Sequence, residues 1–469
     1  MKYFAATLSL LALLASANVY AESPPTLRLD FFHTGNHEME VFSVDEVVIE
    51  PLPWPGNMQW PLDSTSRGKY LFEVIDPESE DILYSRSFSS IYGEWETTGE
   101  ARKMNRTFHE SLRFPMPDKI VTVVLKKRGA GNVFEEIWRT PVDPNDYMNH
   151  EESAQYADQL VAIHESGDPA KKVDLLLLGD GYTAEEQEAF IEKARELTDI
   201  LLATSPFKER ADDINVWALA PAAMESGISR PFYDTHRDSP LRSTYDSFRS
   251  KRYILTFDNK SMRRVASSAP YDFIEILTNS ETYGGGGIYG LFSTAAANGE
   301  WAPYLFVHEF GHHFAGLADE YYTSPVAYTT PDEIIEPYEP NVTALLDPDN
   351  LKWGHLVAES TPIPTPWPKQ QYDKFSIEAQ KVRAEMRNNN APESEMNELF
   401  RDGLAFNDKI FSKAPYKDAI GAFQGANYDA QAYYRSEQNC IMFTRVEQFC
   451  SVCSGAIEQV IDEYSRSPK

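Results

Sequence analysis

The sequence predicts a multidomain protein in which an N-terminal all-β sandwich precedes an α/β domain. Up to about residue 140, short runs of alternating or β-branched residues are separated by Gly, Pro, Asp and Asn, which is typical of antiparallel strands. Between residues 165 and 325, strand-like and helix-like segments alternate, as they do in α/β domains. The stretch 141–146, which contains two prolines and two aspartates, separates the two patterns and is interpreted as a linker.

The first 21 residues have the pattern of a secretory signal peptide. Lys2 precedes a mostly apolar run from Leu8 to Ala15, and Ala21 stands at the expected cleavage site. This run is too short to span a bilayer, and no later stretch approaches the length of a membrane span. We therefore expect a signal peptide at 1–21, a β-sandwich domain at 24–145 and a second domain at 150–469, in a secreted or periplasmic protein without membrane insertion.

The composition excludes some classes of partner. The net charge is −29, from 72 acidic and 43 basic residues, and such a charge repels nucleic acid and anionic membrane surfaces. The 42% content of hydrophobic residues argues against disorder. We therefore expect a folded protein with no nucleic-acid partner.

Individual elements follow from the same patterns. In the second domain, Thr183 is expected to cap a helix that runs to about Thr204. The glycines Gly284–Gly287 follow an apolar strand, and they are expected either to border a cleft or to form a flexible loop. The expected strands are 27–32, 41–49, 70–74, 82–88, 110–114, 120–126, 173–178, 214–220 and 273–277, and the other expected helices are 376–387, 393–404 and 454–464.

The most specific motif is the pair His308 and His312, with Glu309 between them. Positions four apart lie on one face of a helix, so both imidazoles can bind one metal ion. A catalytic Zn²⁺ takes three protein ligands and leaves a position for water. Glu309 is the expected general base, because its carboxylate can accept a proton from water that the metal activates.

The third ligand is expected just beyond the end of this helix. The apolar segment 301–317 has Pro303 near its start, and Gly316 falls where the chain must turn, because glycine readily adopts left-handed dihedrals. That turn can bring Asp319 or Glu320 back to the histidines, and we favour Asp319. The adjacent His313 points elsewhere on the helix and is interpreted as a packing or supporting residue.

All three cysteines lie near the C-terminus, at Cys440, Cys450 and Cys453. In an oxidising compartment they predict one disulfide from Cys440 to either Cys450 or Cys453, with one thiol left over. The short spacing between Cys450 and Cys453 also occurs in zinc ribbons and redox pairs, but no second cysteine pair or strand–helix context supports either interpretation.

Several of these segments resemble the secreted IgA-peptidase-type zinc metallopeptidases, a metzincin-like family. The similarity extends over nearly the whole mature chain, and Ser436 departs from it because proline is expected after Tyr434-Arg435. The resemblance implies that Met442 forms a turn beneath the metal, in addition to its ordinary role as a core residue. The matching segments are 29–36, 90–98, 177–182, 308–320, 434–435, 440–442 and 449–453.

These features together predict a secreted zinc-dependent endopeptidase with a protein or glycoprotein substrate. The expected cofactor is Zn²⁺, bound by His308, His312 and Asp319. The alternatives are a binding or adhesion protein with a structural metal, and a zinc hydrolase that acts on a non-protein amide. Residues expected to support the site are Gly316, Glu320, Tyr434 and Met442, and the candidate donors to a developing oxyanion are Tyr321, Tyr322, Tyr434, Arg435 and His236.

Overall fold

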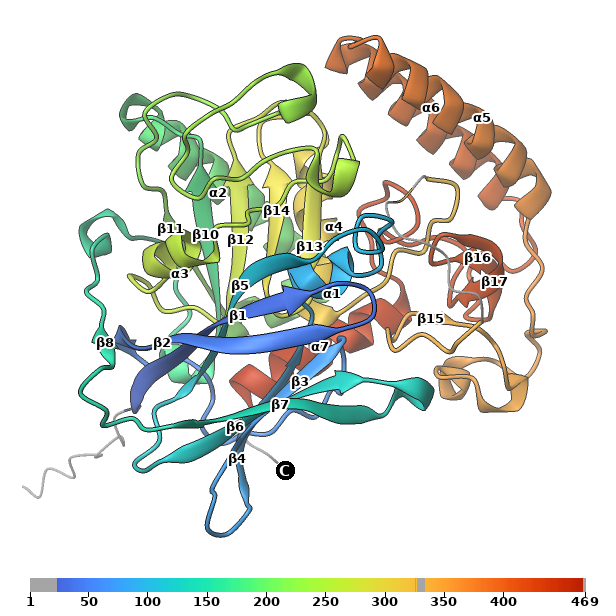
Figure 1. The fold of residues 1–469 in the computed structure, drawn as a ribbon. Coiled ribbons are helices and arrows are strands. Elements are labelled where there is room, and N and C mark those ends of the chain that lie inside the picture. Colours follow the sequence, from blue (N-terminus) through green and yellow to red (C-terminus); the bar gives the residue numbers. More distant parts are fainter. Residues whose placement is uncertain (1–22, 325, 327–333, 467–469) are drawn as a thin grey trace, which may run out of the picture.

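The N-terminal region of the chain contains two four-stranded sheets (Figure 1). The computed structural model describes residues 23–324, 326 and 334–466, so the expected signal peptide at 1–21 lies outside the described residues. The strand orders are β5-β1-β2-β8 and β4-β3-β6-β7. The strands are β1 (Pro25–Gly35), β2 (Glu40–Pro53), β3 (Tyr70–Ile75), β4 (Ile82–Phe88), β5 (Arg106–Pro115), β6 (Val121–Arg128), β7 (Phe134–Val142) and β8 (His150–Glu151).

One hydrophobic core joins these two sheets. Phe31 from β1 and Phe114 from β5 meet Phe72 from β3 and Val123 from β6, and all four side chains are buried. Each strand expected in this region is present. The region also contains the short helix α1 (Ile91–Trp95), so it is not purely β.

Strand β7 was not expected, and it corrects the interpretation of residues 141–146 as a linker. Its last residues, Pro141 and Val142, pair with β6 and belong to the sheet. The strand lies at the sheet edge, and most of its side chains are at least partly exposed. Because its apolar residues do not alternate with polar ones, the periodicity that identifies a half-buried strand is missing.

The second region is built on a six-stranded sheet in the order β13-β14-β12-β10-β11-β9. The four inner strands are parallel and the two outer strands are antiparallel to their neighbours, which confirms the α/β prediction. The strands are β9 (Val161–His164), β10 (Val173–Asp180), β11 (Ile214–Leu219), β12 (Phe273–Thr278), β13 (Gly285–Ile288) and β14 (Phe292–Ala296).

Helices cover both faces of this sheet. Alternate residues of β10 point to opposite faces: Leu175 and Leu177 pack with α2 (Gln187–Ala203), α4 (Ala302–Ala315) and α7 (Ser451–Ser465), whereas Leu176 and Leu178 pack with α3 (Asn259–Ala266). The expected cap at Thr183 is confirmed as a capping box with Glu186. Tyr92 and Trp95 of α1 join the second of these clusters, so the two regions share packed surface.

The glycine stretch forms strand β13 and not a flexible loop. A Cβ atom on Gly285 would lie 2.9 Å from Cγ of Glu309, and one on Gly287 would lie 2.3 Å from the Glu309 carbonyl oxygen. Side chains at these positions would therefore push α4 away from the sheet. The glycines serve the close packing of the motif helix.

The rest of the chain adds two long helices and a small sheet. Helices α5 (Lys369–Asn388) and α6 (Glu393–Phe411) form a pair that stands at the upper right of Figure 1. Both were expected, although α5 begins seven residues earlier than the pattern indicated. The sheet contains β15 (Val342–Thr343), β16 (Phe423–Ala426) and β17 (Asp429–Arg435). Among the described residues, no helix is both long and apolar enough to cross a membrane.

Candidate metal centre

Helix α4 carries the histidine motif as expected. It begins with Pro303 in its first turn and ends at Gly316, whose φ of 58° and ψ of 36° are left-handed. The Leu317 N–H donates to the carbonyl oxygen of Gly311 across this turn. The chain therefore reverses direction immediately after the helix, which brings Asp319 back to the histidine face.

Three side-chain atoms converge beside α4. The Nε2 atoms of His308 and His312 lie 3.2 Å apart, and Oδ1 of Asp319 lies 3.2 Å from each of them. His308 and Asp319 are buried, and His312 is half-buried. Within the described part of the chain, Oδ1 of Asp319 has no hydrogen-bond partner other than this pair of imidazoles. The three atoms form an almost equilateral triangle.

The hydrogen bonds on the far side of each imidazole decide where the lone pairs point. Nδ1 of His308 lies 3.0 Å from the carbonyl oxygen of Ile441, and Nδ1 of His312 lies 2.6 Å from that of Leu317. A carbonyl oxygen only accepts, so this network assigns the proton of each neutral imidazole to Nδ1. Both Nε2 lone pairs and the Asp319 carboxylate then face one point, and a cation suits that arrangement.

The pKa shifts of Asp319 and His312 also indicate that positive charge is favourable between these side chains. Burial acts to raise the pKa of Asp319, but the charges of His312 and His308 hold that pKa well below its ordinary value. Burial acts to lower the pKa of His312, yet Asp319 raises it to about 9. A proton on His312 and a metal ion would therefore compete for the same place in the cluster.

The two neighbouring acids, Asp319 and Glu320, point in different directions. Oδ2 of Asp319 accepts a hydrogen bond from the Tyr428 hydroxyl, on the turn between β16 and β17. Oε1 of Glu320 accepts one from Nδ2 of Asn341 at 3.0 Å and faces the cysteines. Sequence reasoning missed Tyr428 and Asn341, because no local spacing connects residues so far from the motif.

Glu309 lies at the edge of the same cluster. A carboxylate oxygen of Glu309 and a ring nitrogen of each of His308 and His312 lie within 4.8 Å of one another. Burial raises the pKa of Glu309, and the nearby histidines partly oppose this rise. The side chain borders a cavity with Arg252, Tyr304 and other residues, so its carboxylate can meet a molecule bound there.

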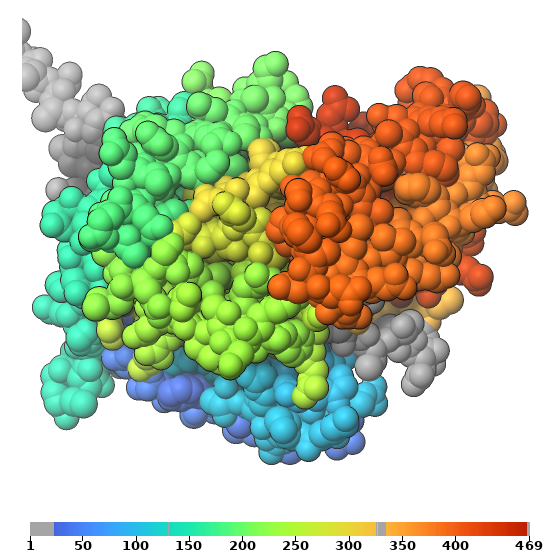
Figure 2. Space-filling view, turned by 90° about the horizontal axis from the view of Figure 1, so that it is seen from above, coloured from blue at the N-terminus to red at the C-terminus, as the bar shows by residue number. Residues whose placement is uncertain are grey.

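The α5–α6 pair forms the opposite wall of this cavity. Phe375 and Arg383 come from α5, and Phe400 from α6. Figure 2 shows the pair in orange beside the yellow and green segments of the sheet region. Burial and two neighbouring guanidinium groups, those of Arg252 and Arg445, lower the pKa of Arg383 to about 9. The cavity is therefore bounded by three arginines, none of which sequence reasoning identified.

The five candidate oxyanion donors are spread over different environments. Tyr321 lines the cavity, its ring is stacked 6.4 Å from that of His308, and its hydroxyl accepts a hydrogen bond from Nη2 of Arg252 at 2.9 Å. Tyr322 donates instead to a carboxylate oxygen of Asp373 on α5. Of the five, the structure thus places Tyr321 in the cavity.

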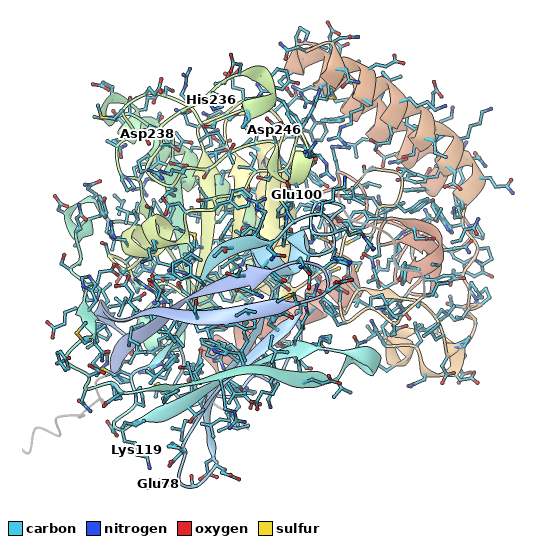
Figure 3. All side chains as sticks on the ribbon, in the orientation of Figure 1. Glu78, Glu100, Lys119, His236, Asp238 and Asp246 are labelled. Carbon is cyan, nitrogen blue, oxygen red and sulfur yellow. The ribbon has the colours of Figure 1, made fainter. Side chains whose placement is uncertain are left out.

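The other three candidates lie away from the cavity lining. Tyr434 is half-buried on β17, where it pairs with Gln424 and Thr343. Arg435 is buried and donates to the carbonyl oxygen of Gly425 at 2.7 Å. His236 is exposed on a surface loop near Asp238, where Figure 3 labels it.

Met442 and His313 support the motif helix from two sides. The Met442 side chain is buried, and its Sδ would lie 3.3 Å from a Cβ atom on Gly311 of α4. Nε2 of His313 accepts from the Ile274 N–H, and Nδ1 donates to the Ile288 carbonyl oxygen. Burial lowers the pKa of His313 to about 3, so this residue stays neutral and ties α4 to the sheet, as its interpretation as a supporting residue requires.

The expected disulfide is not present, which corrects that prediction. Cys440, Cys450 and Cys453, all in the described part of the chain, are free and buried. Sγ of Cys440 lies 3.8 Å from Sγ of Cys453, almost twice the length of a disulfide bond. The number and spacing of the cysteines predicted one disulfide. In the structure, all three cysteines instead lie around the carboxylate of Glu320.

Similarity to known families accords with this geometry. A family model described as Peptidase M64 N-terminus matches residues 19–139, and one described as IgA Peptidase M64 matches residues 161–461. No curated protein matches the chain. The second match alone covers more than half of the 469 residues and includes the whole cluster around α4. The chain therefore belongs to the IgA peptidase M64 family and is a peptidase.

Proposed function

We propose that this protein is a secreted zinc-dependent endopeptidase in which His308, His312 and Asp319 bind the metal. The observation that carries the proposal is the convergence of two Nε2 lone pairs and one carboxylate oxygen at 3.2 Å. In a tetrahedral zinc site with ligands at about 2.0–2.1 Å, neighbouring ligand atoms are about 3.3 Å apart. The observed triangle therefore fits three ligands of one zinc ion.

Each residue near the zinc has a distinct role in this proposal. When bound, zinc supplies a positive charge that makes water easier to deprotonate and that polarises a peptide carbonyl. Glu309 accepts the proton of the attacking water and passes it to the leaving amine. Ile441 and Leu317 hold the two imidazoles through their carbonyl oxygens. Met442 packs beneath the helix and keeps it in place.

The alternatives explain fewer of these features. A purely structural metal site has four protein ligands and needs no carboxylate such as that of Glu309 beside a cavity. A hydrolase for non-protein amides could use the same cluster, but the family match supports a peptidase. Secretion is proposed from the pattern of residues 1–21 alone, and the expected domains at 24–145 and 150–469 likewise remain proposals.

Hydrolysis of an unfolded protein with and without a chelator tests the proposed function. We expect the purified chain to cleave such a substrate at internal bonds, to lose activity in the chelator, and to regain it when zinc is added. The products are identified by mass spectrometry of the new termini. Hydrolysis that persists after complete metal removal, or no hydrolysis by the zinc-loaded protein, would contradict the proposal.

Tyr321 is proposed as the donor that stabilises the developing oxyanion. Burial raises the pKa of Tyr321, so its hydroxyl remains protonated at neutral pH. Because Arg252 donates to the hydroxyl oxygen, the hydroxyl proton is directed away from Arg252. Both residues line the cavity beside Glu309, where a substrate carbonyl must lie for attack.

Replacement of Tyr321 with Phe should therefore lower kcat by roughly 10²-fold, because one preorganised donor to the oxyanion is lost. Zinc content and KM should change little, since the ring and the ligands remain. The matched control is Tyr322→Phe, whose hydroxyl bonds to Asp373 outside the reacting centre. Steady-state kinetics on a defined peptide measure both variants. An unchanged kcat for Tyr321→Phe would remove this residue from the proposed mechanism.

A further inference from the structure

A second set of possible metal ligands lies behind the first. We call it the Cys–Glu cluster, and it consists of Glu320, Cys440, Cys450 and Cys453, all buried. One ligand atom from each residue lies within 4.8 Å of all the others. Sγ of Cys453 is 3.8 Å from Sγ of Cys440 and 3.6 Å from Oε1 of Glu320, and Sγ of Cys450 is 3.9 Å from that oxygen.

These distances match the edges of a tetrahedron around one zinc ion. With zinc–sulfur distances of about 2.3 Å and a zinc–oxygen distance of about 2.1 Å, two sulfurs are separated by about 3.8 Å, and a sulfur and the oxygen by about 3.6 Å. A disulfide would instead bring two sulfurs to about 2.05 Å and leave the third thiol and Glu320 without a common partner.

Backbone and hydroxyl groups face two of the three sulfur atoms, those of Cys440 and Cys450, and such donors favour a thiolate. The Cys450 N–H points at Sγ of Cys440 at 3.2 Å, and the Cys453 N–H points at Sγ of Cys450 at 3.4 Å. The Ser436 hydroxyl lies 3.2 Å from the same Cys450 sulfur. Cys450 is also the N-cap of α7, a helix of 15 residues, and a helix N-terminus stabilises a thiolate.

The carboxyl group of Glu320 lies among three thiols with only one of its oxygens satisfied. Oε2 of Glu320 is buried and has no hydrogen-bond partner among the described residues, although Asn341 orients the other oxygen. The nearby Arg435 donates to the carbonyl oxygens of Gly425 and Gln438 and not to Glu320. A buried polar atom without a partner is costly, whereas a cation held by all four ligands would compensate the carboxylate.

We propose that the Cys–Glu cluster binds a second zinc ion, with a structural role. Soft thiolate ligands in a tetrahedral arrangement select zinc over the hard cations Mg²⁺ and Ca²⁺. Four protein ligands close the site, in contrast to the three-ligand cluster on α4, so this ion has no position for a substrate. The same ion keeps the three thiols from oxidation to a disulfide in an oxidising compartment.

The second ion is positioned to hold the ligands of the first. Glu320 directly follows Asp319, and its N–H donates to the Met442 carbonyl oxygen at 2.8 Å. Ile441, which follows Cys440, accepts from Nδ1 of His308. The Cys–Glu cluster therefore anchors both the Asp319 turn and the segment that orients His308, so its loss should weaken zinc binding at the α4 site as well.

Metal analysis of the full-length protein tests this proposal. We expect two zinc ions per chain, and X-ray absorption at the zinc edge should show sulfur neighbours at about 2.3 Å together with nitrogen and oxygen neighbours. This measurement uses the wild-type protein and does not depend on the folding of a variant. A single ion per chain, with only nitrogen and oxygen neighbours, would overturn the proposal.

Variants separate the two ions. After reconstitution with Co²⁺, the wild type and Asp319→Ala should both show the near-ultraviolet charge-transfer band of thiolate bound to cobalt. In Cys453→Ser this band should be clearly weaker or absent, because one of the three thiolate ligands is lost. Ser436→Ala is the matched control, because it removes a neighbour of Cys450 that is not a ligand, and it should keep the band. Since Asp319→Ala reports the thiolate site alone, failure of the proposed peptidase function would leave this result unaffected.

Two further outcomes count against the second ion. Peptide mapping of the native protein under non-reducing conditions could find a disulfide between two of the three cysteines. Alternatively, all three thiols could react rapidly with an alkylating reagent in the folded protein without release of zinc. We expect neither, and we expect slow alkylation that accelerates when a strong chelator removes the metal.

Discussion

Replacement of Glu309 with Gln is expected to lower kcat by roughly 10²–10⁴-fold while zinc binding is retained. The amide has nearly the same shape as the carboxylate but cannot accept the proton of the attacking water. Zinc binding should persist, because the proposed ligands are His308, His312 and Asp319. Turnover of a defined peptide and zinc content are measured on the same preparation, so that loss of the base is distinguished from loss of the metal.

Glu300→Gln is the matched control for this variant. Glu300 precedes α4, is half-exposed and pairs with Arg401 on α6, away from the reacting centre. The same change from acid to amide there should leave kcat close to that of the wild type. Turnover by Glu309→Gln within a few-fold of the wild type would mean that another group accepts the proton.

The features of the site that are local in sequence could be predicted. The spacing of His308 and His312 and the helix-ending Gly316 lie within nine residues, and backbone geometry alone brings them and Asp319 together. Arg252 could not be found in this way, because it reaches the cavity through pairing of its segment with Gly285 on β13.

The same distinction explains two of the segments whose structure the sequence did not reveal. The glycines of β13 have no side chains, so hydrophobic periodicity could not identify a strand whose function is close contact with α4. The cysteines were interpreted by their number and spacing, whereas their arrangement depends on Glu320, more than a hundred residues earlier in the chain. A disulfide prediction that uses only the number and spacing of cysteines cannot take account of a distant carboxylate that the fold places next to them.

Replacement of Asp319 with Ala is expected to weaken zinc binding at the α4 site by at least about 100-fold. Residues that only support a ligand typically contribute about 10–100-fold to metal affinity, so loss of a ligand should exceed that range. Without the carboxylate, His308 and His312 would face each other at 3.2 Å with no negative group between them. Competition with a chromogenic chelator measures the affinity, and hydrolysis should fall in parallel and recover in part at high zinc concentration.

Tyr428→Phe is the comparison variant for Asp319→Ala, and it should lower zinc affinity by a smaller amount. The Tyr428 hydroxyl donates to Oδ2 of Asp319, which leaves Oδ1 directed at the histidines. Removing that hydroxyl lets the carboxylate rotate but keeps the ligand, so zinc affinity should fall by about 10–100-fold and not further. If Asp319→Ala instead bound zinc as tightly as the wild type, Asp319 would not be a ligand. The triangle beside α4 would then be an ion pair between a carboxylate and a protonated histidine, with His312 holding the proton that its raised pKa allows.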